Sequence, residues 1–281
     1  MTESNAAAGN EKRYEGAADY IASKELRSAV NAAITLGRPI LIKGEPGTGK
    51  TMLAKSIADS LGLDLIVWSV KSTTKAKDGL YVYDTVQRLY DSQFGEAGVS
   101  DIARYIHPGR LGEAFASEEP SVLLIDEIDK ADVEFPNDLL WELDMMSFYI
   151  PETKETVAAK SVPIVVITSN AEKELPDAFL RRCVFHYIEF PDPDRMKEIL
   201  GVHFPDLDEK LARNAMNAFY KLRDVRGMMK KPSTSELLDW LKVLKKEKIS
   251  LDSIERELPL LGVLLKNNED AALARNRLAG Q

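Results

Sequence analysis

One stretch of the chain, Leu41–Thr51 (LIKGEPGTGKT), constrains the fold more than any other. Residues Gly44–Thr51 fit the pattern G-x-x-x-x-G-K-[ST], in which a glycine-rich loop turns its backbone N–H groups toward phosphate. The apolar run Pro39–Ile42 before the loop indicates a buried strand, and the apolar spacing of Met52–Ala58 after it indicates a helix. A strand, this loop and a helix in succession are the context that the pattern requires. The sequence therefore predicts an α/β protein that binds a nucleoside triphosphate.

Each kind of residue in the loop has a physical task. Three glycines let the backbone curl, because they accept conformations that other residues avoid. Lys50 places a positive charge on the β- and γ-phosphates, and Thr51 offers a hydroxyl to Mg²⁺. The helix that follows also turns its N-terminus toward the phosphates. We therefore predict that the nucleotide is bound by Gly44, Glu45, Pro46, Gly47, Thr48, Gly49, Lys50, Thr51 and Met52.

The overall composition limits the remaining classes of protein. A length of 281 residues suits one domain with a smaller second one, and a net charge of −8 argues against a broad nucleic-acid footprint. The single cysteine, Cys183, excludes a disulfide framework within the chain and fits a reducing compartment. The sequence has no apolar run of about 18 residues and no signal pattern at its start, so we expect no membrane segment and a cytoplasmic protein. Residues 1–13 are expected to be a disordered tail.

A second strand carries acidic residues at its end. The run Val122–Ile125 is fully apolar and bounded by Pro120 and by acids, which indicates a strand buried on both faces. Ligands in open α/β sheets bind at the carboxyl ends of the strands, where Asp126 and Glu127 follow. Asp126 is predicted to hold Mg²⁺ together with Thr51, and Glu127 to orient and deprotonate the attacking water. A simple acidic strand cap is the alternative interpretation.

A third buried strand, Ile164–Thr168, is followed by Ser169 and Asn170. The Asn170 amide is placed to bond the γ-phosphate or the attacking water, although an asparagine after a strand is commonly only a turn residue. Further along, a short predicted helix ends at Arg181 and Arg182. Arginines in such a position are, taken alone, more often surface charges than catalytic groups.

Two further segments and a boundary complete the organisation. Lys71–Asp84 is polar and then aromatic, and we predict a projecting loop or hairpin that either contacts a partner, substrate or neighbouring subunit or is a solvated connection. Phe148–Val157 is predicted to be a β-hairpin with a polar tip. Pro191–Pro193 breaks the pattern, so we place an α/β core over residues 14–191 and a helical domain over 192–281. In the helical domain, Ser233–Glu236 reads as a capping box that opens a helix.

Taken together, these motifs resemble the AAA+ ATPases and, within them, the MoxR-like group. The resemblance covers roughly residues 14–260 and rests on Gly44–Thr51, Val122–Glu127, Thr168–Asn170 and Leu175–Cys183, with Lys231–Trp240 typical of one MoxR-like branch. It implies a parallel five-stranded sheet of order 5-1-4-3-2 and a small helical lid over the nucleotide. It also implies that ATP and Mg²⁺ bind between the subunits of a homo-oligomeric ring, usually a hexamer.

The same resemblance assigns roles to single residues. Asn170 matches the residue called sensor 1, which contacts the γ-phosphate. Arg182 matches the arginine finger that reaches the neighbouring subunit's γ-phosphate, with Arg181 as the alternative. The segments Lys71–Asp84 and Phe148–Val157 match insertions that line the face or pore of such rings.

One departure from the family pattern concerns the lid. An arginine called sensor 2 is usual early in the helix that begins here near Thr234, but Ser235 and Glu236 occupy that region. A carboxylate there would repel phosphate. Lys230 and Lys231, just before the helix, are the candidates to replace the arginine.

The resemblance also suggests a function. MoxR-like proteins typically act with a partner that has a von Willebrand factor A domain, and they remodel or mature a target, often by inserting a metal or cofactor. We therefore expect an ATP-hydrolysing chaperone with such a partner. The alternatives are a nucleic-acid or GTP-driven motor or loader, which the acidic net charge opposes, and a regulatory nucleotide switch, which the filled catalytic positions oppose.

Overall fold

The computed structural model describes residues 13–95, 98–170, 172–247, 249–250, 253–254 and 257–279. Of the tail predicted over residues 1–13, all but Arg13 lies outside these ranges. The chain forms two compact units. The first comprises Met1–Lys43 with Lys50–Tyr187, and the second comprises Gly44–Gly49 with Ile188–Gln281.

A five-stranded sheet with the strand order β2-β5-β8-β1-β9 is the centre of the fold. Its strands are β1 (Ile40–Gly44), β2 (Asp64–Ser69), β5 (Ser121–Asp126), β8 (Ile164–Ser169) and β9 (Val184–Ile188). The pairings β2/β5, β5/β8 and β8/β1 are parallel. If these five strands are numbered 1 to 5 along the chain and the sheet is followed from β9 to β2, the order is 5-1-4-3-2. The predicted sheet and the α/β class are therefore confirmed.

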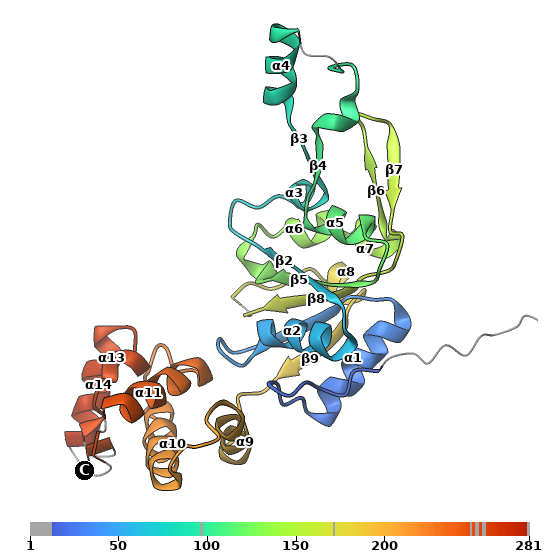
Figure 1. Cartoon of the computed structure of the whole chain (residues 1–281). Coiled ribbons are helices and arrows are strands. Elements are labelled where there is room, and N and C mark those ends of the chain that lie inside the picture. Colours follow the sequence, from blue (N-terminus) through green and yellow to red (C-terminus); the bar gives the residue numbers. More distant parts are fainter. Residues whose placement is uncertain are drawn as a thin grey trace, which may run out of the picture. The chain divides into compact units, whose positions relative to one another are not determined.

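Helices cover both faces of this sheet, which explains why its central strands are apolar throughout. Figure 1 shows α1 and α2 on one side and α5, α6 and α7 on the other. The helices of this unit are α1 (Lys24–Leu36), α2 (Lys50–Leu61), α3 (Ala76–Leu80), α4 (Thr85–Phe94), α5 (Arg110–Ala116), α6 (Phe135–Asp138), α7 (Leu140–Met145) and α8 (Asp177–Leu180), with short 3₁₀ turns η1 (Ile102–Tyr105) and η2 (Ile128–Lys130).

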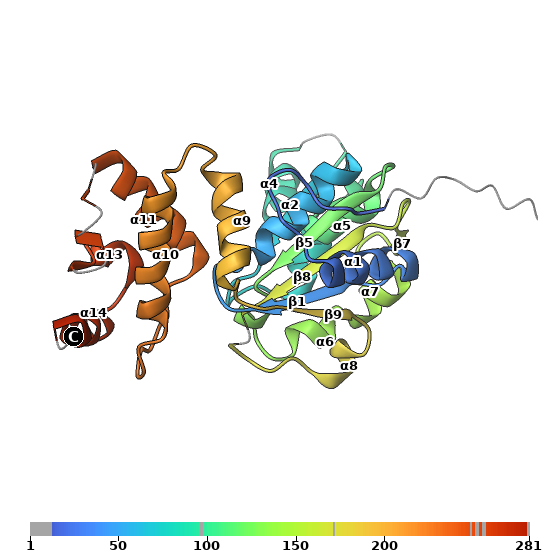
Figure 2. The same cartoon turned by 90° about the horizontal axis from the view of Figure 1, so that it is seen from below.

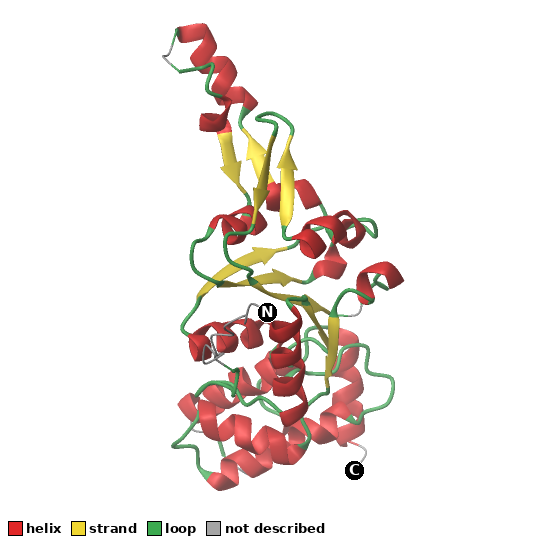
Figure 3. Ribbon diagram, turned by 90° about the vertical axis from the view of Figure 1, so that its right-hand side faces the viewer, coloured by secondary structure: helices red, strands yellow, loops and turns green. Residues whose placement is uncertain are grey.

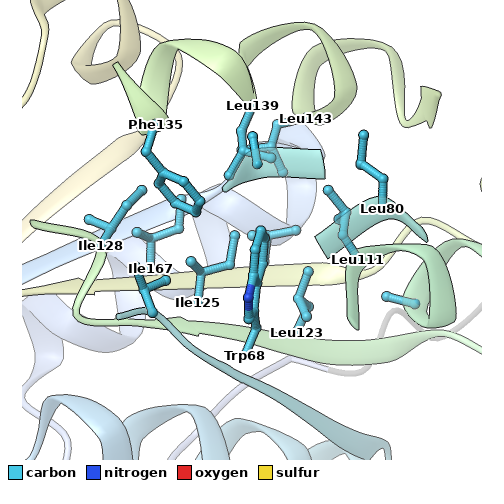
Figure 4. Packing of buried hydrophobic residues seen from close by; sticks show 14 of the residues in the cluster. Trp68, Leu80, Leu111, Leu123, Ile125, Ile128, Phe135, Leu139, Leu143 and Ile167 are labelled. Atoms are coloured by element: carbon cyan, nitrogen blue, oxygen red, sulfur yellow. The ribbon is translucent and has the colours of Figure 1, made fainter. Parts of the chain in front are cut away.

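The main core fills the space between the sheet and α5–α7 (Figure 4). Leu123, Ile125 and Ile167 of the strands meet Leu139 of the helical layer, all fully buried. Trp68 of β2 packs edge-on against Phe135, with ring centroids 5.5 Å apart. Burying one side chain of this size stabilises the folded state by about 1.5–3 kcal/mol compared with leaving it exposed. This core therefore fixes the strand ends that carry the site.

Two antiparallel ribbons extend from the first unit beside each other (Figures 1 and 3). One pairs β3 (Tyr81–Tyr83) with β4 (Ile106–Pro108), and the other pairs β6 (Ser147–Ile150) with β7 (Glu155–Ala158). The Tyr81 hydroxyl donates to Glu152 Oε2 at 2.7 Å, and the Tyr81 ring stacks on Phe148 at 6.1 Å between centroids. The predicted hairpin at Phe148–Val157 is confirmed.

The prediction for Lys71–Asp84 is correct only at its end. β3 is a strand, but the residues before it form α3, a single helical turn too short to show a period in the sequence. Gly79 of α3 lies against the Trp68 ring so closely that a Cβ there would be 2.1 Å from a ring carbon. A glycine is therefore required for α3 to pack on the core.

The segment from Phe135 to Met145 forms two short helices, α6 and α7, rather than one continuous helix. Between α6 and α7, Leu139 donates its N–H to the Pro136 carbonyl three residues back, a tighter turn than the α-helical ladder allows. The left-handed backbone of Met146 (φ 46°) then ends α7.

The second unit is helical (Figure 2). Its helices are α9 (Pro193–His203), α10 (Glu209–Arg223), α11 (Thr234–Glu247), α13 (Leu261–Leu264) and α14 (Asn268–Ala279). Fully buried Trp240 and Phe219 lie in their shared core. The predicted capping box is confirmed, because Ser233 N–H donates to Glu236 Oε2 at 2.7 Å and Glu236 N–H to Ser233 Oγ at 3.5 Å. Among the described residues, no helix is long and apolar enough to cross a bilayer.

Candidate functional site

Asp126 lies at the centre of a group of oxygen atoms at the carboxyl end of the sheet. β5 and β8 pair in register with Ile125 beside Ile167, so the next residues, Asp126 and Thr168, lie next to each other. Asp126 Oδ1 accepts the Thr168 hydroxyl at 2.6 Å and the Thr51 hydroxyl, from the start of α2, at 3.0 Å. The structure thus brings together the two predicted metal ligands, Thr51 and Asp126.

The donor atoms of this pair fit Mg²⁺. A hydroxyl that donates its proton to a carboxylate keeps its oxygen lone pairs for a cation. Mg²⁺ in nucleotide enzymes is usually held by one or two carboxylates, waters and the substrate phosphates rather than by a protein cage. The part of the chain that the structure describes holds no group of three or more His, Cys, Asp or Glu side chains suited to a metal ion.

Glu127 has an unusual backbone and two side-chain partners. Its φ of 58° and ψ of 52° are left-handed, a conformation that few residues other than glycine adopt. Its N–H donates to Thr168 Oγ1 at 2.8 Å, which holds this conformation. In the side chain, Oε1 accepts the Asn170 amide at 2.9 Å and Oε2 pairs with Lys130. The predicted base and the predicted sensor 1 residue are therefore in direct contact.

Asp129 holds the loop that carries Asn170. Its side chain is buried, with 3 % of the residue exposed, and it accepts two backbone N–H groups. One comes from Asn170 at 3.3 Å and the other from Glu172 at 2.9 Å. A carboxylate that accepts two backbone N–H groups fixes the loop that donates them.

Three more residues contact Asp126, Glu127 or Asn170 and had no role predicted from the sequence: Thr168, Asp129 and Lys130. A signal existed for Thr168, because aligning the two apolar strands places it beside Asp126. Lys130 follows Glu127 by one turn and its pKa is raised, first by the hydrogen bond to Glu127 and then by that carboxylate's charge.

The glycine-rich loop has the conformation that its sequence predicts. Gly47 and Gly49 have positive φ values of 73° and 88°. The Thr48 hydroxyl donates to the Glu45 carbonyl at 2.9 Å and closes the turn. Gly44–Gly49 belong to the second compact unit, whereas Lys50 opens α2 in the first unit and is buried, with 6 % exposed.

The remaining predicted residues have other surroundings. Met52 is partly exposed in the first turn of α2, and Pro46 lies in the loop's turn. Arg182 follows α8, where its Nε pairs with Asp144 and its Nη1 donates to the Ala178 carbonyl at 3.0 Å. Its side chain is 44 % exposed. The contacts of Arg182 are thus made outside the Asp126 group.

A strand, a glycine-rich loop and a helix, with an acidic strand end beside the helix, define a P-loop nucleoside triphosphatase. Residues 40–192, more than half of the chain, match the family described as "ATPase family associated with various cellular activities (AAA)". The chain belongs to this family.

Several known proteins are similar to the chain. A putative 26S proteasome regulatory subunit homolog of Methanothermobacter thermautotrophicus is 33% identical over 169 residues, which are 56% of this chain and 36% of that protein. A mitochondrial Lon protease homolog of Phaeodactylum tricornutum is 27% identical over 227 residues, 78% of this chain and 22% of that protein. A chloroplastic ATP-dependent zinc metalloprotease FTSH of Nicotiana tabacum is 26% identical over 262 residues, which are 85% of this chain and 31% of that protein. The chain spans about a third or less of the length of these relatives.

Proposed function

We propose that the chain hydrolyses ATP at the Gly44–Thr51 loop and the Asp126 group. The loop's backbone, Lys50 and Met52 bind the triphosphate, and Thr51 and Asp126 hold Mg²⁺. When bound, the metal ion neutralises phosphate charge. The contact that carries this proposal is the 2.9 Å hydrogen bond between Asn170 and Glu127, because it aligns a carboxylate base with an amide donor.

The chain's own residues then have defined tasks. Glu127 accepts a proton from the attacking water as the water oxygen bonds to the γ-phosphorus and ADP leaves. Asn170 orients the Glu127 carboxylate on one side, and Lys130 contacts it on the other. Thr168 fixes the Glu127 backbone and the Asp126 side chain together, so the base and the metal ligand keep a constant separation.

Two substitutions test this assignment. Lys50→Ala removes the phosphate-binding charge, so nucleotide binding should be lost. Glu127→Gln keeps shape but cannot accept the proton, so binding should persist while turnover falls by about a hundredfold or more. Titration with a fluorescent ATP analogue and a phosphate-release assay measure the two effects, and full turnover by the Glu127→Gln protein would overturn the assignment of the base.

At the finer level, we propose a MoxR-like chaperone that forms a homo-oligomeric ring, such as a hexamer, and remodels a protein target with a von Willebrand A-domain partner. The run Lys231–Trp240 and its capping box support this proposal. The relatives named above carry proteasome, Lon and FtsH names, so they favour protein remodelling without pointing to this partner.

The alternative functions make different predictions in solution. A nucleic-acid motor would bind DNA with a strong salt dependence. A GTP-driven motor would prefer GTP in competition, and a regulatory switch would bind nucleotide without turnover. A nucleotide-preference assay and a salt-dependent DNA-binding assay therefore distinguish them from the proposed chaperone.

A further inference from the structure

The phosphate-binding loop carries a negative charge of its own. Glu45 is the second residue of Gly44–Thr51, and its side chain is 44 % exposed. Charges interact appreciably within about 8 Å at physiological ionic strength. An isolated carboxylate on a short loop that must receive phosphates therefore opposes their binding.

Arg223 pairs with this carboxylate within the second compact unit. It is the last residue of α10, and its side chain is 8 % exposed. Its Nη2 lies 2.8 Å from Glu45 Oε2. An arginine is always charged in proteins, and a buried charge is tolerated only with partners, so Glu45 and Arg223 stabilise each other.

The guanidinium of Arg223 is held from two other directions. Its Nη1 donates to the Pro232 carbonyl, and its carbon lies 3.3 Å from the centroid of the Phe190 ring. A planar guanidinium stacked on an aromatic ring and bonded at both nitrogens has little freedom to turn. Arg223 therefore presents its charge to Glu45 in one fixed geometry.

A second contact brings the same two segments together. Gly47, the glycine at the middle of the loop, approaches Ser233, and a Cβ at Gly47 would lie 2.5 Å from Ser233 Cβ. Ser233 directly follows Pro232, the residue whose carbonyl Arg223 binds. The loop and the segment before α11 are thus in contact at Gly47 and joined through Arg223 at Glu45.

The segment before α11 is anchored at its other end as well. Asp270, at the start of α14, is buried and accepts the N–H groups of Met229 at 2.8 Å and Lys230 at 3.0 Å. The chain from Met229 to Ser233 is therefore held by α14 on one side and by Arg223 of α10 on the other. A rigid segment of this kind can fix the position of the loop that contacts it.

We propose that Arg223 is a positioning residue of the nucleotide site, which acts by neutralising Glu45 and fixing the glycine-rich loop. The inference rests on the proposed nucleotide site. The proposed role of Arg223 is distinct from the role predicted for Lys230 and Lys231, whose side chains are exposed.

A double-mutant comparison tests the proposal. Arg223→Met removes the guanidinium that faces Glu45 on the loop, so the affinity for a fluorescent ADP analogue should fall about tenfold. Adding Glu45→Gln to that protein removes the carboxylate charge and should restore the affinity to within about threefold of the wild type. Arg195→Met removes a partly buried arginine of α9 in the same unit, one that pairs with Glu198 instead of the loop, so it is the matched control and should bind as the wild type does.

A role confined to holding the helical unit together predicts a different result. In that case Arg223→Met weakens binding and Glu45→Gln brings no recovery, which would overturn the proposal. A wild-type protein that does not bind the analogue would instead overturn the proposed nucleotide site.

A second variant applies if Arg223→Met does not fold. Glu45→Arg changes only the loop and adds a cation where phosphate binds, so simple charge attraction predicts tighter binding. The proposal predicts weaker binding by about fivefold or more, because two guanidinium groups then repel each other and displace the loop. Tighter binding by Glu45→Arg would contradict it, provided that thermal unfolding shows a folded protein.

Discussion

At the scale of single residues, the backbone of Glu127 links the whole catalytic group. A left-handed residue other than glycine is strained by about 1–3 kcal/mol and persists only where its surroundings hold it. Here the buried Thr168 hydroxyl accepts the Glu127 N–H and donates to Asp126. One threonine therefore sets the positions of both the proposed base, Glu127, and the proposed metal ligand, Asp126.

Asp129 offers a direct test of how the Asn170 loop is positioned. Asp129→Asn keeps the size of the side chain, but an amide nitrogen cannot accept the N–H of Asn170 or Glu172. We expect kcat to fall roughly tenfold to a hundredfold, because a small displacement of a catalytic contact has effects of this size. The KM for ATP should change little, since Asp129 does not belong to the phosphate-binding loop.

Steady-state phosphate release measures this prediction, with Asp132→Asn as the control. Asp132 is an exposed acid three residues along the chain, so its change should leave kcat unaltered. An unchanged kcat in Asp129→Asn, with normal folding, would show that the loop keeps its position without the carboxylate.

The residues that the sequence predicted differ in kind from those it did not. Lys50, Thr51, Asp126 and Glu127 belong to short local motifs whose spacing is itself the signal. Arg223 lies 178 positions from its partner Glu45, and no local pattern marks such a pair. Roles of this kind depend on tertiary contacts that only the fold creates.

At the scale of secondary-structure elements, α14 contributes to the site's surroundings through one side chain. Burial opposes ionisation of Asp270, but hydrogen bonds from Met229, Lys230 and Asn267 outweigh it and hold the pKa of this carboxyl below its usual value of 3.8. The charged carboxylate is thus the form that stabilises the segment before α11.

This direction of shift fixes the expected pH dependence. A carboxyl whose folded-state pKa is lowered contributes stability above its unfolded pKa, and the contribution disappears as the pH falls through the folded-state value. Asp270→Asn should therefore melt at a lower temperature than the wild type at pH 7, and the difference should shrink below about pH 4. Thermal unfolding followed by circular dichroism measures it, and a difference that stays constant down to pH 3 would contradict the assignment.

The elements were predicted with uneven success for a physical reason. Central strands such as β5 and β8 are buried on both faces, so their apolar runs are visible in the sequence. By contrast, α3 has five residues and α6 has four. Elements of about one turn have no measurable period, and their existence depends on packing, as in the approach of Gly79 to Trp68.

At the scale of the whole molecule, the site holds the proposed base and the proposed metal-binding pair, while the predicted arginine finger makes its contacts elsewhere. Arg182 pairs with Asp144 and is partly exposed. A buried ion pair would be difficult to break, but an exposed pair is worth only about 0–1 kcal/mol. In the proposed ring, Arg182 would therefore exchange Asp144 for the more highly charged γ-phosphate of a neighbouring subunit at little cost.

Mixing two inactive proteins tests this arrangement. An Arg182→Ala subunit keeps its own Glu127 but lacks the finger, and a Glu127→Gln subunit keeps the finger but lacks the base. If Arg182 acts in a neighbouring subunit, each protein alone should hydrolyse ATP poorly. A mixture in equal amounts should regain activity at about a quarter of its interfaces, where an intact base faces an intact finger.

Phosphate release by the mixture, compared with the sum of the two separate proteins, measures this recovery. Activity should also rise with protein concentration, because dilution dissociates the subunits that share a site. Arg181→Ala in place of Arg182→Ala is the matched control: it should be active alone if Arg182 is the finger, and inactive if the finger is Arg181. A mixture no more active than its components, when size measurement shows that both variants assemble, would mean that each subunit carries its complete site.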